Sequence, residues 1–186
     1  MKPDNTVATY SFTVRIIHWG MAVLLLSLLL AGLTMVRSLE PWQPALLGLH
    51  KSLGTIAFIA VITRLSARLD SASPGLPQAM HPLQRAAARS SHLLLYVLMI
   101  ALPLSGYLMQ SAAGRPIHVF DWLTIPTAFP VNLELYGLFR ETHFALAASL
   151  AVLVLIHIGA ALHHGLVRRD GVLQSITLPK GKLDKA

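Results

Sequence analysis

Nine histidines in a largely apolar chain of 186 residues are the side chains best suited to do chemistry. Ionisable residues are costly inside a bilayer and mark functional sites when they occur there. His143 and His157 lie fourteen positions apart in one apolar stretch. In a helix, fourteen residues make about four turns, which would place both rings on nearly one face and about 21 Å apart along the axis. One helix would then present a nitrogen ligand in each half of the membrane.

Each of these two histidines needs a partner at the same depth on another helix. If successive helices alternate in direction, His50 lies near the outer end of the second helix and pairs with His143. His18 lies near the inner end of the first helix, where the helix directions pair it with His157. Depth alone favours His164 instead, which follows His143 by 21 positions and lies near the same face. The spacing therefore leaves two candidates for the fourth ligand.

Two separated pairs of histidines favour haem over zinc or copper. Haem iron held by two imidazoles exchanges single electrons, and a helix bundle offers an apolar slot for the macrocycle. Zinc and copper prefer three or four clustered ligands, often with carboxylate or thiolate. The four apolar stretches contain no acidic residue, and the chain has no cysteine, which also excludes covalent attachment of haem. We therefore predict two non-covalent haems of the b type.

Four apolar stretches must position these histidines, at about 13–36, 44–65, 91–109 and 142–167. Each reaches the roughly 20 apolar residues that a membrane-spanning helix needs. The whole chain is 54% hydrophobic and 12% charged, whereas about a quarter of the residues in soluble domains are charged. These features predict an all-α integral membrane protein, a single domain over residues 1–186 folded as a bundle of four transmembrane helices.

The basic residues predict the orientation of this bundle. Eleven of the fifteen lysines and arginines fall on the side of the two termini, and four fall on the other side. By the positive-inside rule, both termini are cytoplasmic. The formal net charge of +7 would suggest nucleic-acid binding in a soluble protein. Because the charges end the apolar stretches, we assign them to topology and lipid headgroups and predict no nucleic-acid partner.

The connection 110–141 is long for a helix bundle and rich in aromatic residues. Long connections are often functional, and amphipathic aromatic side chains settle at membrane interfaces. We interpret this segment as an outer interfacial cap, with a passive loop as an equally good alternative. The aromatic residues are Phe120, Trp122, Phe129, Tyr136 and Phe139.

The other histidines receive ordinary roles at this stage. For His92, at the start of the third helix, the alternatives are a hydrogen bond to a haem propionate and a helix cap, of which the cap is favoured. His81 and His118 are expected to be surface residues in connections. Pro103 should kink the third helix and free a carbonyl group.

Several short stretches carry a family resemblance: Arg-Ile-Ile-His-Trp at 15–19, Leu-His-Lys-Ser-Leu-Gly at 49–54, Arg-Leu-Ser-Ala-Arg-Leu at 64–69, Leu-Tyr-Val-Leu-Met at 95–99, Leu-Pro-Leu-Ser-Gly at 102–106, Glu-Thr-His at 141–143 and Arg-Asp-Gly-Val-Leu at 169–173. On these residues, nearly the whole chain resembles the prokaryotic cytochrome b561 group of four-helix dihaem membrane cytochromes. The resemblance implies a bacterial inner-membrane protein whose axial haem ligands are His18, His50, His143 and His157.

The resemblance also implies a function. One branch of the family, similar to this chain in length and layout, oxidises superoxide outside the membrane and reduces ubiquinone, which predicts an oxidoreductase that feeds the quinone pool. Lys51, Arg115 and Arg140 are the candidates for steering an anionic donor on the outer side. On the inner side, Arg15 is the candidate for a haem propionate and His164 for proton delivery to quinone. The alternative is a haem-bearing anchor that relays electrons from a soluble dehydrogenase or hydrogenase.

Overall fold

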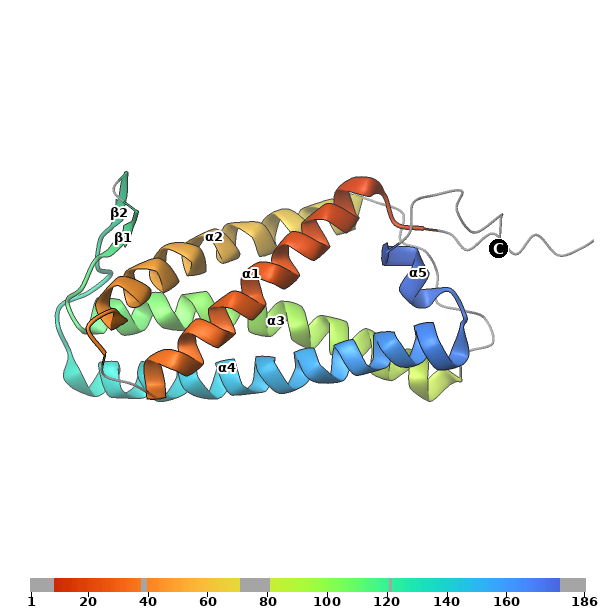
Figure 1. Cartoon of the computed structure of the whole chain (residues 1–186). Coiled ribbons are helices and arrows are strands. Elements are labelled where there is room, and N and C mark those ends of the chain that lie inside the picture. The colour runs from red at the N-terminus through yellow and green to blue at the C-terminus, as the bar shows by residue number, and fades with distance from the viewer. Residues whose placement is uncertain (1–8, 38–39, 71–80, 121, 178–186) are drawn as a thin grey trace, which may run out of the picture.

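The computed structural model describes the chain in four stretches, 9–37, 40–70, 81–120 and 122–177. Its main elements are four long helices (Figure 1), namely α1 (Phe12–Arg37), α2 (Gln43–Asp70), α3 (Pro82–Ala112) and α4 (Leu133–Leu162). A six-residue π-helix, η1 (His163–Arg168), continues α4. All four helices are long and apolar enough to cross a membrane. The prediction of an all-α bundle of four spanning helices is therefore confirmed.

The helices pack mainly with their neighbours in the chain. α3 packs most extensively against α4, α1 packs against α2, and α2 packs against α3. α1 runs obliquely past α3 and α4 rather than parallel to them (Figure 1). The best-buried large side chains are Leu150, Val61 and Val119, whereas much of the apolar helix surface faces outward. That outward apolar surface is expected when lipid rather than water surrounds the bundle.

Two helices begin earlier than hydropathy predicted. α3 starts at Pro82 rather than near 91, because the side chain of His81 accepts a hydrogen bond from the backbone of Leu83 and a proline follows the cap. α4 starts at Leu133 rather than near 142, where the side chain of Asn132 caps the first turn. Hydropathy marks only the part of a helix that lies in hydrocarbon, so polar first turns escape it.

The segment 110–141, predicted to be a loop, is mostly structured. α3 continues to Ala112, an antiparallel hairpin of β1 (Ile117–Val119) and β2 (Leu123–Ile125) follows, and α4 begins before the segment ends. The hairpin lies at one end of the bundle, beside the start of α2 (Figure 1). We call this end the hairpin end.

The buried hydroxyl of Ser52 fastens the hairpin to α2. It donates to the carbonyl oxygen of His118 at 3.2 Å and accepts from the backbone N–H of Phe120 at 3.0 Å. The side chain of Ser52 is only 2% exposed. A connection tied to a helix in this way is a built part of the bundle rather than a passive loop.

A short helix, α5 (Val172–Thr177), closes the opposite end, which we call the α5 end (Figure 1). The chain reverses before it through two positive φ angles, 51° at Arg169 and 83° at Gly171. Carbonyl groups of α5 then accept hydrogen bonds from the start of α1: Thr177 from the guanidinium of Arg15 at 3.0 Å, and Ile176 from the indole of Trp19 at 3.3 Å. These contacts join the two ends of the described chain.

Candidate functional site

The structure brings His50 of α2 and His143 of α4 together near the hairpin end. Their ring centres are 6.4 Å apart and the ring planes meet at 74°. A metal–imidazole bond is about 2 Å long, and the ring centre lies about 1 Å beyond the bonded nitrogen, so two imidazoles on one iron have centres about 6 Å apart. The observed separation fits this arrangement. We call these two residues the hairpin-end pair.

Hydrogen bonds to α3 hold the ring of His143 in a form that can bind a metal. Its Nδ1 lies 3.1 Å from the carbonyl oxygen of Leu102 and 3.0 Å from the hydroxyl of Ser105, which itself donates to Leu102 at 2.7 Å. A carbonyl only accepts, so Nδ1 carries the proton. Nε2 is then left with the free lone pair that coordinates iron.

Two glycines let neighbouring helices approach the hairpin-end pair. A Cβ added to Gly106 of α3 would lie 3.2 Å from Cε1 of His143, closer than an ordinary contact. A Cβ on Gly32 of α1 would touch Cε1 of His50 at 3.8 Å. Gly106 thus lets α3 approach the predicted ligand itself, and α3 continues through Pro103 as a helix.

The second pair lies toward the α5 end, where His18 of α1 and His157 of α4 have ring centres 6.4 Å apart and planes at 68°. We call these residues the α5-end pair. Of the two candidates that spacing left open, His157 lies beside His18, whereas His164 bonds elsewhere. α1 begins only one residue before its predicted start, so an extension of this helix does not explain why His18 and His157 lie at the same depth. The oblique course of α1 (Figure 1) explains it instead.

A third imidazole beside this pair was not anticipated. His92 of α3 has its ring centre 5.5 Å from that of His157. Its predicted role as a helix cap is wrong, because His81 caps α3 and His92 lies in the third turn. The proline that follows His81 is typical of a helix start and was the signal that would have placed His92 inside the helix.

The remaining predicted residues of the α5 end lie near α5. Nδ1 of His164 is 2.6 Å from Oδ2 of Asp170, and Nε of Arg168 is 3.8 Å from the same oxygen. His164 lies on the π-helix η1, and π-helical turns often occur at functional sites. The guanidinium of Arg15 is bound to the carbonyl of Thr177. His164 and Arg15 thus lie at one end of the bundle, on α4's continuation and on α1.

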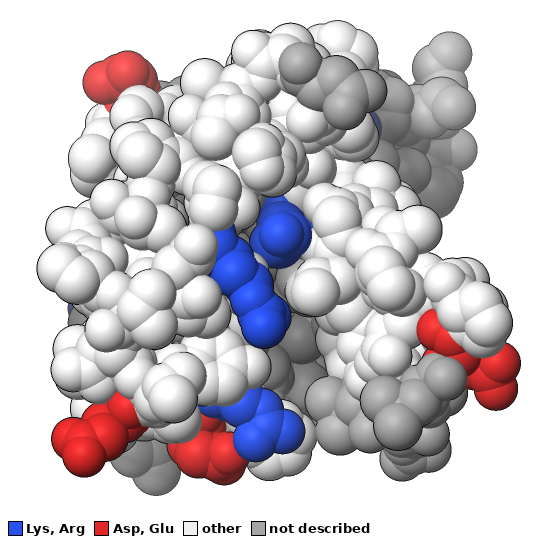
Figure 2. Space-filling view, turned by 90° about the vertical axis from the view of Figure 1, so that its left-hand side faces the viewer, with Lys and Arg blue, Asp and Glu red and all other residues white. Residues whose placement is uncertain are grey.

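Lys51, Arg115 and Arg140 belong to the opposite, hairpin end. Figure 2 shows basic side chains near the centre of this face and, toward its lower edge, basic and acidic side chains next to one another. Arg140 forms an exposed ion pair with Glu141 at 3.4 Å. The side chains of Lys51 and Arg115 form no ion pair with the parts of the chain that the structure describes. Positive charge is therefore present at the centre of this face, away from the acidic side chains at its edge.

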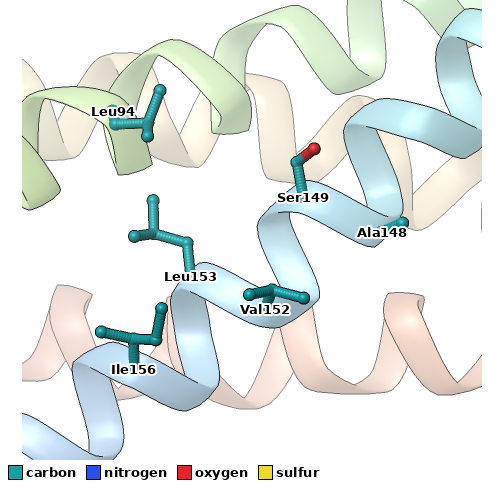
Figure 3. A pocket seen from close by; sticks show the side chains of 6 residues that line it. All are labelled: Leu94, Ala148, Ser149, Val152, Leu153 and Ile156. Carbon is teal, nitrogen blue, oxygen red and sulfur yellow. The ribbon is translucent and has the colours of Figure 1, made fainter.

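An apolar pocket of about 470 Å³ lies between α3 and α4 (Figure 3). By helical periodicity, its α4 residues lie on the side of the helix away from His143 and His157. The pocket therefore faces lipid rather than the paired imidazoles. Its lining is Leu94, Ala148, Ser149, Val152, Leu153 and Ile156.

Comparison with known proteins assigns a family to this arrangement. Residues 9–178 match the family profile described as prokaryotic cytochrome b561. The Escherichia coli (strain K12) protein named cytochrome b561 homolog 2 is 33% identical over 176 residues, which cover 94% of each chain. The chain belongs to the prokaryotic cytochrome b561 family. It is accordingly an integral membrane protein that transfers electrons and uses haem b.

Two further relatives of this family member are more distant. A Yersinia pestis protein named "Probable superoxide oxidase CybB" is 29% identical over 161 residues, covering 84% of this chain and 89% of that protein. Cytochrome b561 homolog 1 of Escherichia coli (strain K12) is 27% identical over 124 residues, or 67% and 70% of the two chains. The two pairs of imidazoles fit the haem b that the family uses, in donor type and in separation.

Proposed function

We propose that this cytochrome moves electrons from superoxide, outside the bacterial inner membrane, to ubiquinone at the cytoplasmic side. The observation that carries the proposal is the presence of two imidazole pairs with the same 6.4 Å separation, one toward each end of the bundle. The hairpin end faces outside, in keeping with the eleven basic residues on the opposite side. Each pair would hold one haem b, which when bound takes up and releases one electron at a time.

The chain's own contribution is the placement of four ligands: His50 with His143 and His18 with His157. His143 and His157 belong to the same helix and are fourteen residues apart, so α4 sets the distance between the two sites at about 21 Å along its axis. Ser105 and Leu102 fix the tautomer of His143. Hydrogen bonds of this kind orient a ligand and tune its basicity.

The charges of the hairpin end support an anionic donor. Lys51 directly follows the ligand His50, and neither Lys51 nor Arg115 forms an ion pair with the described residues. Arg140 would add to the local field, reduced by its ion pair with Glu141. A local positive surface raises the encounter rate of a small anion. Superoxide would lose one electron here and leave as dioxygen, in keeping with the name of the Yersinia pestis relative.

The α5 end would serve the acceptor. Ubiquinone needs two electrons, from two superoxide anions, and two protons to become ubiquinol. The carboxylate of Asp170 holds Nδ1 of His164 at 2.6 Å, which orients the ring and leaves Nε2 to pass a proton. Arg15 also lies at this end, with its Nε buried and without a hydrogen-bond partner among the described residues. We assign it to a propionate of the haem held by the α5-end pair.

Stopped-flow mixing of the purified cytochrome with superoxide, with and without ubiquinone, tests the proposal. We expect superoxide to reduce the haems, which raises the absorbance of the α band, and ubiquinone to reoxidise them, which lowers it again. His50→Ala should remove one of two haems from the spectrum and abolish reduction by superoxide. If superoxide leaves the haems oxidised while a co-purifying dehydrogenase or hydrogenase reduces them, the protein is the anchor of such an enzyme instead.

A further inference from the structure

Arg64 of α2 is a cation close to the end of an apolar, membrane-spanning stretch. It lies six residues before the end of α2 at Asp70, which is about 9 Å along the axis. Its Nη1 is shielded from solvent and has no hydrogen-bond partner in the described part of the chain. An arginine that served only as a topology signal would extend its guanidinium to the headgroups. Arg64 does not, so its charge has another role.

The charge of Arg64 acts on imidazoles contributed by the three other long helices. It interacts electrostatically with all members of the α5-end cluster, which are His18, His157 and His92. Within the described ranges, none of the ion pairs includes Arg64. Asp170, an acid of the same end, is bound to His164 and Arg168. Buried charges in proteins are normally paired, and here the described chain supplies no anion.

An anionic group held between the helices, at the depth of the α5-end pair, would supply the missing negative charge. We propose that Arg64 binds a propionate carboxylate of the haem held by His18 and His157, and that its charge raises the reduction potential of that haem. This inference rests on the proposed haem site. A guanidinium pairs with a carboxylate through two parallel hydrogen bonds, so it neutralises and orients the group at once.

The role differs from that assigned to Arg15 at the same end. One guanidinium nitrogen of Arg15 is engaged with the carbonyl of Thr177, so this residue also ties α1 to α5. Arg64 has no such structural bond among the described residues. Its charge acts on all three imidazoles of the α5-end cluster, whereas that of Arg68 acts on His92.

The charge of Arg64 predicts a change in the redox equilibrium. A fixed positive charge favours the reduced haem, which carries one positive charge less than the oxidised form. Arg64→Gln removes that charge and also leaves the propionate unneutralised, so both effects favour oxidation. We expect at least a tenfold shift of the equilibrium toward the oxidised haem, equivalent to about 59 mV for one electron. The haem of the hairpin-end pair should keep its potential.

Potentiometric titration of the purified holoprotein, followed at the α band, measures this shift. Infrared redox difference spectra, recorded with haem labelled with ¹³C at its propionate carboxyl groups, show whether the carboxylate bands change. Arg89→Gln is the matched control, because it removes the same charge from an exposed position on α3 at the same end. Arg64→Lys keeps the charge but not the two parallel hydrogen bonds, and should change the carboxylate bands with a smaller shift in potential.

The proposal is overturned if Arg64→Gln titrates like Arg89→Gln and leaves the labelled bands unchanged. A second outcome also overturns the proposal. If Arg64→Gln shifts the potential without changing the labelled bands, and removal of bound phospholipid abolishes this shift, the anion bound by Arg64 is a lipid phosphate. If Arg64→Gln fails to retain haem, the labelled bands of Arg64→Lys decide by the same criterion. Failure of the proposed haem site itself would appear differently, as an unchanged haem spectrum in His18→Ala.

Discussion

Gly106 offers a sharp test of how the hairpin-end pair is held. A methyl group at this position would lie 3.2 Å from Cε1 and 3.4 Å from Nδ1 of His143. The ring cannot simply move away, because its Nδ1 is bonded to Leu102 and Ser105 on the same helix, α3. Gly106→Ala must therefore displace the imidazole by a few tenths of an ångström and weaken these bonds.

The expected magnitude follows from two opposing terms. Overpacking of a close contact costs about 1–3 kcal/mol, whereas replacing a helical glycine with alanine gains about 1 kcal/mol. Gly137→Ala isolates the first term, since a Cβ at Gly137 of α4 meets nothing within 4 Å and the helical gain is shared. Gly106→Ala should thus be about 1–3 kcal/mol less stable than Gly137→Ala. For a chain of this size, that corresponds to a difference in melting temperature of about 2–12 °C.

The assay is thermal loss of the haem α band, with the haem content of the purified variants as a second measurement. Gly106→Ala should release haem at a lower temperature than Gly137→Ala and should alter the electron paramagnetic resonance signal of one haem only. Equal melting temperatures together with identical spectra would show that α3 does not constrain the ring of His143. That result would refute the assignment of His143 as a ligand oriented by α3.

Three further predictions concern other parts of the molecule. Ser52→Ala leaves the backbone N–H of Phe120 without its acceptor and should cost about 1–3 kcal/mol; faster hydrogen exchange in 117–125, with no change in α5, would be the sign. Asp170→Asn removes the carboxylate from His164 and should slow ubiquinone-dependent reoxidation about tenfold while the spectrum is unchanged; reoxidation at the native rate would exclude the proton role. Lys51→Gln should lower the rate of reduction by superoxide at low salt, and the difference from the native protein should shrink as ionic strength rises. A salt-independent difference would exclude steering by this charge.

The local properties of the sequence were enough to predict the spanning helices. Length and hydropathy of a stretch decide whether it can cross a bilayer, and neither depends on the rest of the fold. The spacing of His143 and His157 similarly specifies their relative placement, because a helix has the same pitch wherever it packs. The hairpin and α5 were not predicted. Their positions depend on contacts such as the bond between Ser52 and the hairpin, which join residues far apart in the chain.

The choice between His157 and His164 shows most clearly which features the sequence determines and which need the tertiary structure. By itself, the sequence determined that the chain forms four membrane helices and that one of them carries histidines in both halves of the bilayer. Only the tertiary structure placed His157 beside His18, added His92, and brought these three imidazoles within the electrostatic reach of Arg64. The physical reason is that the oblique course of α1 (Figure 1) decides which residue of α4 lies level with His18. A helix crossing angle is a property of two packed surfaces rather than of either sequence.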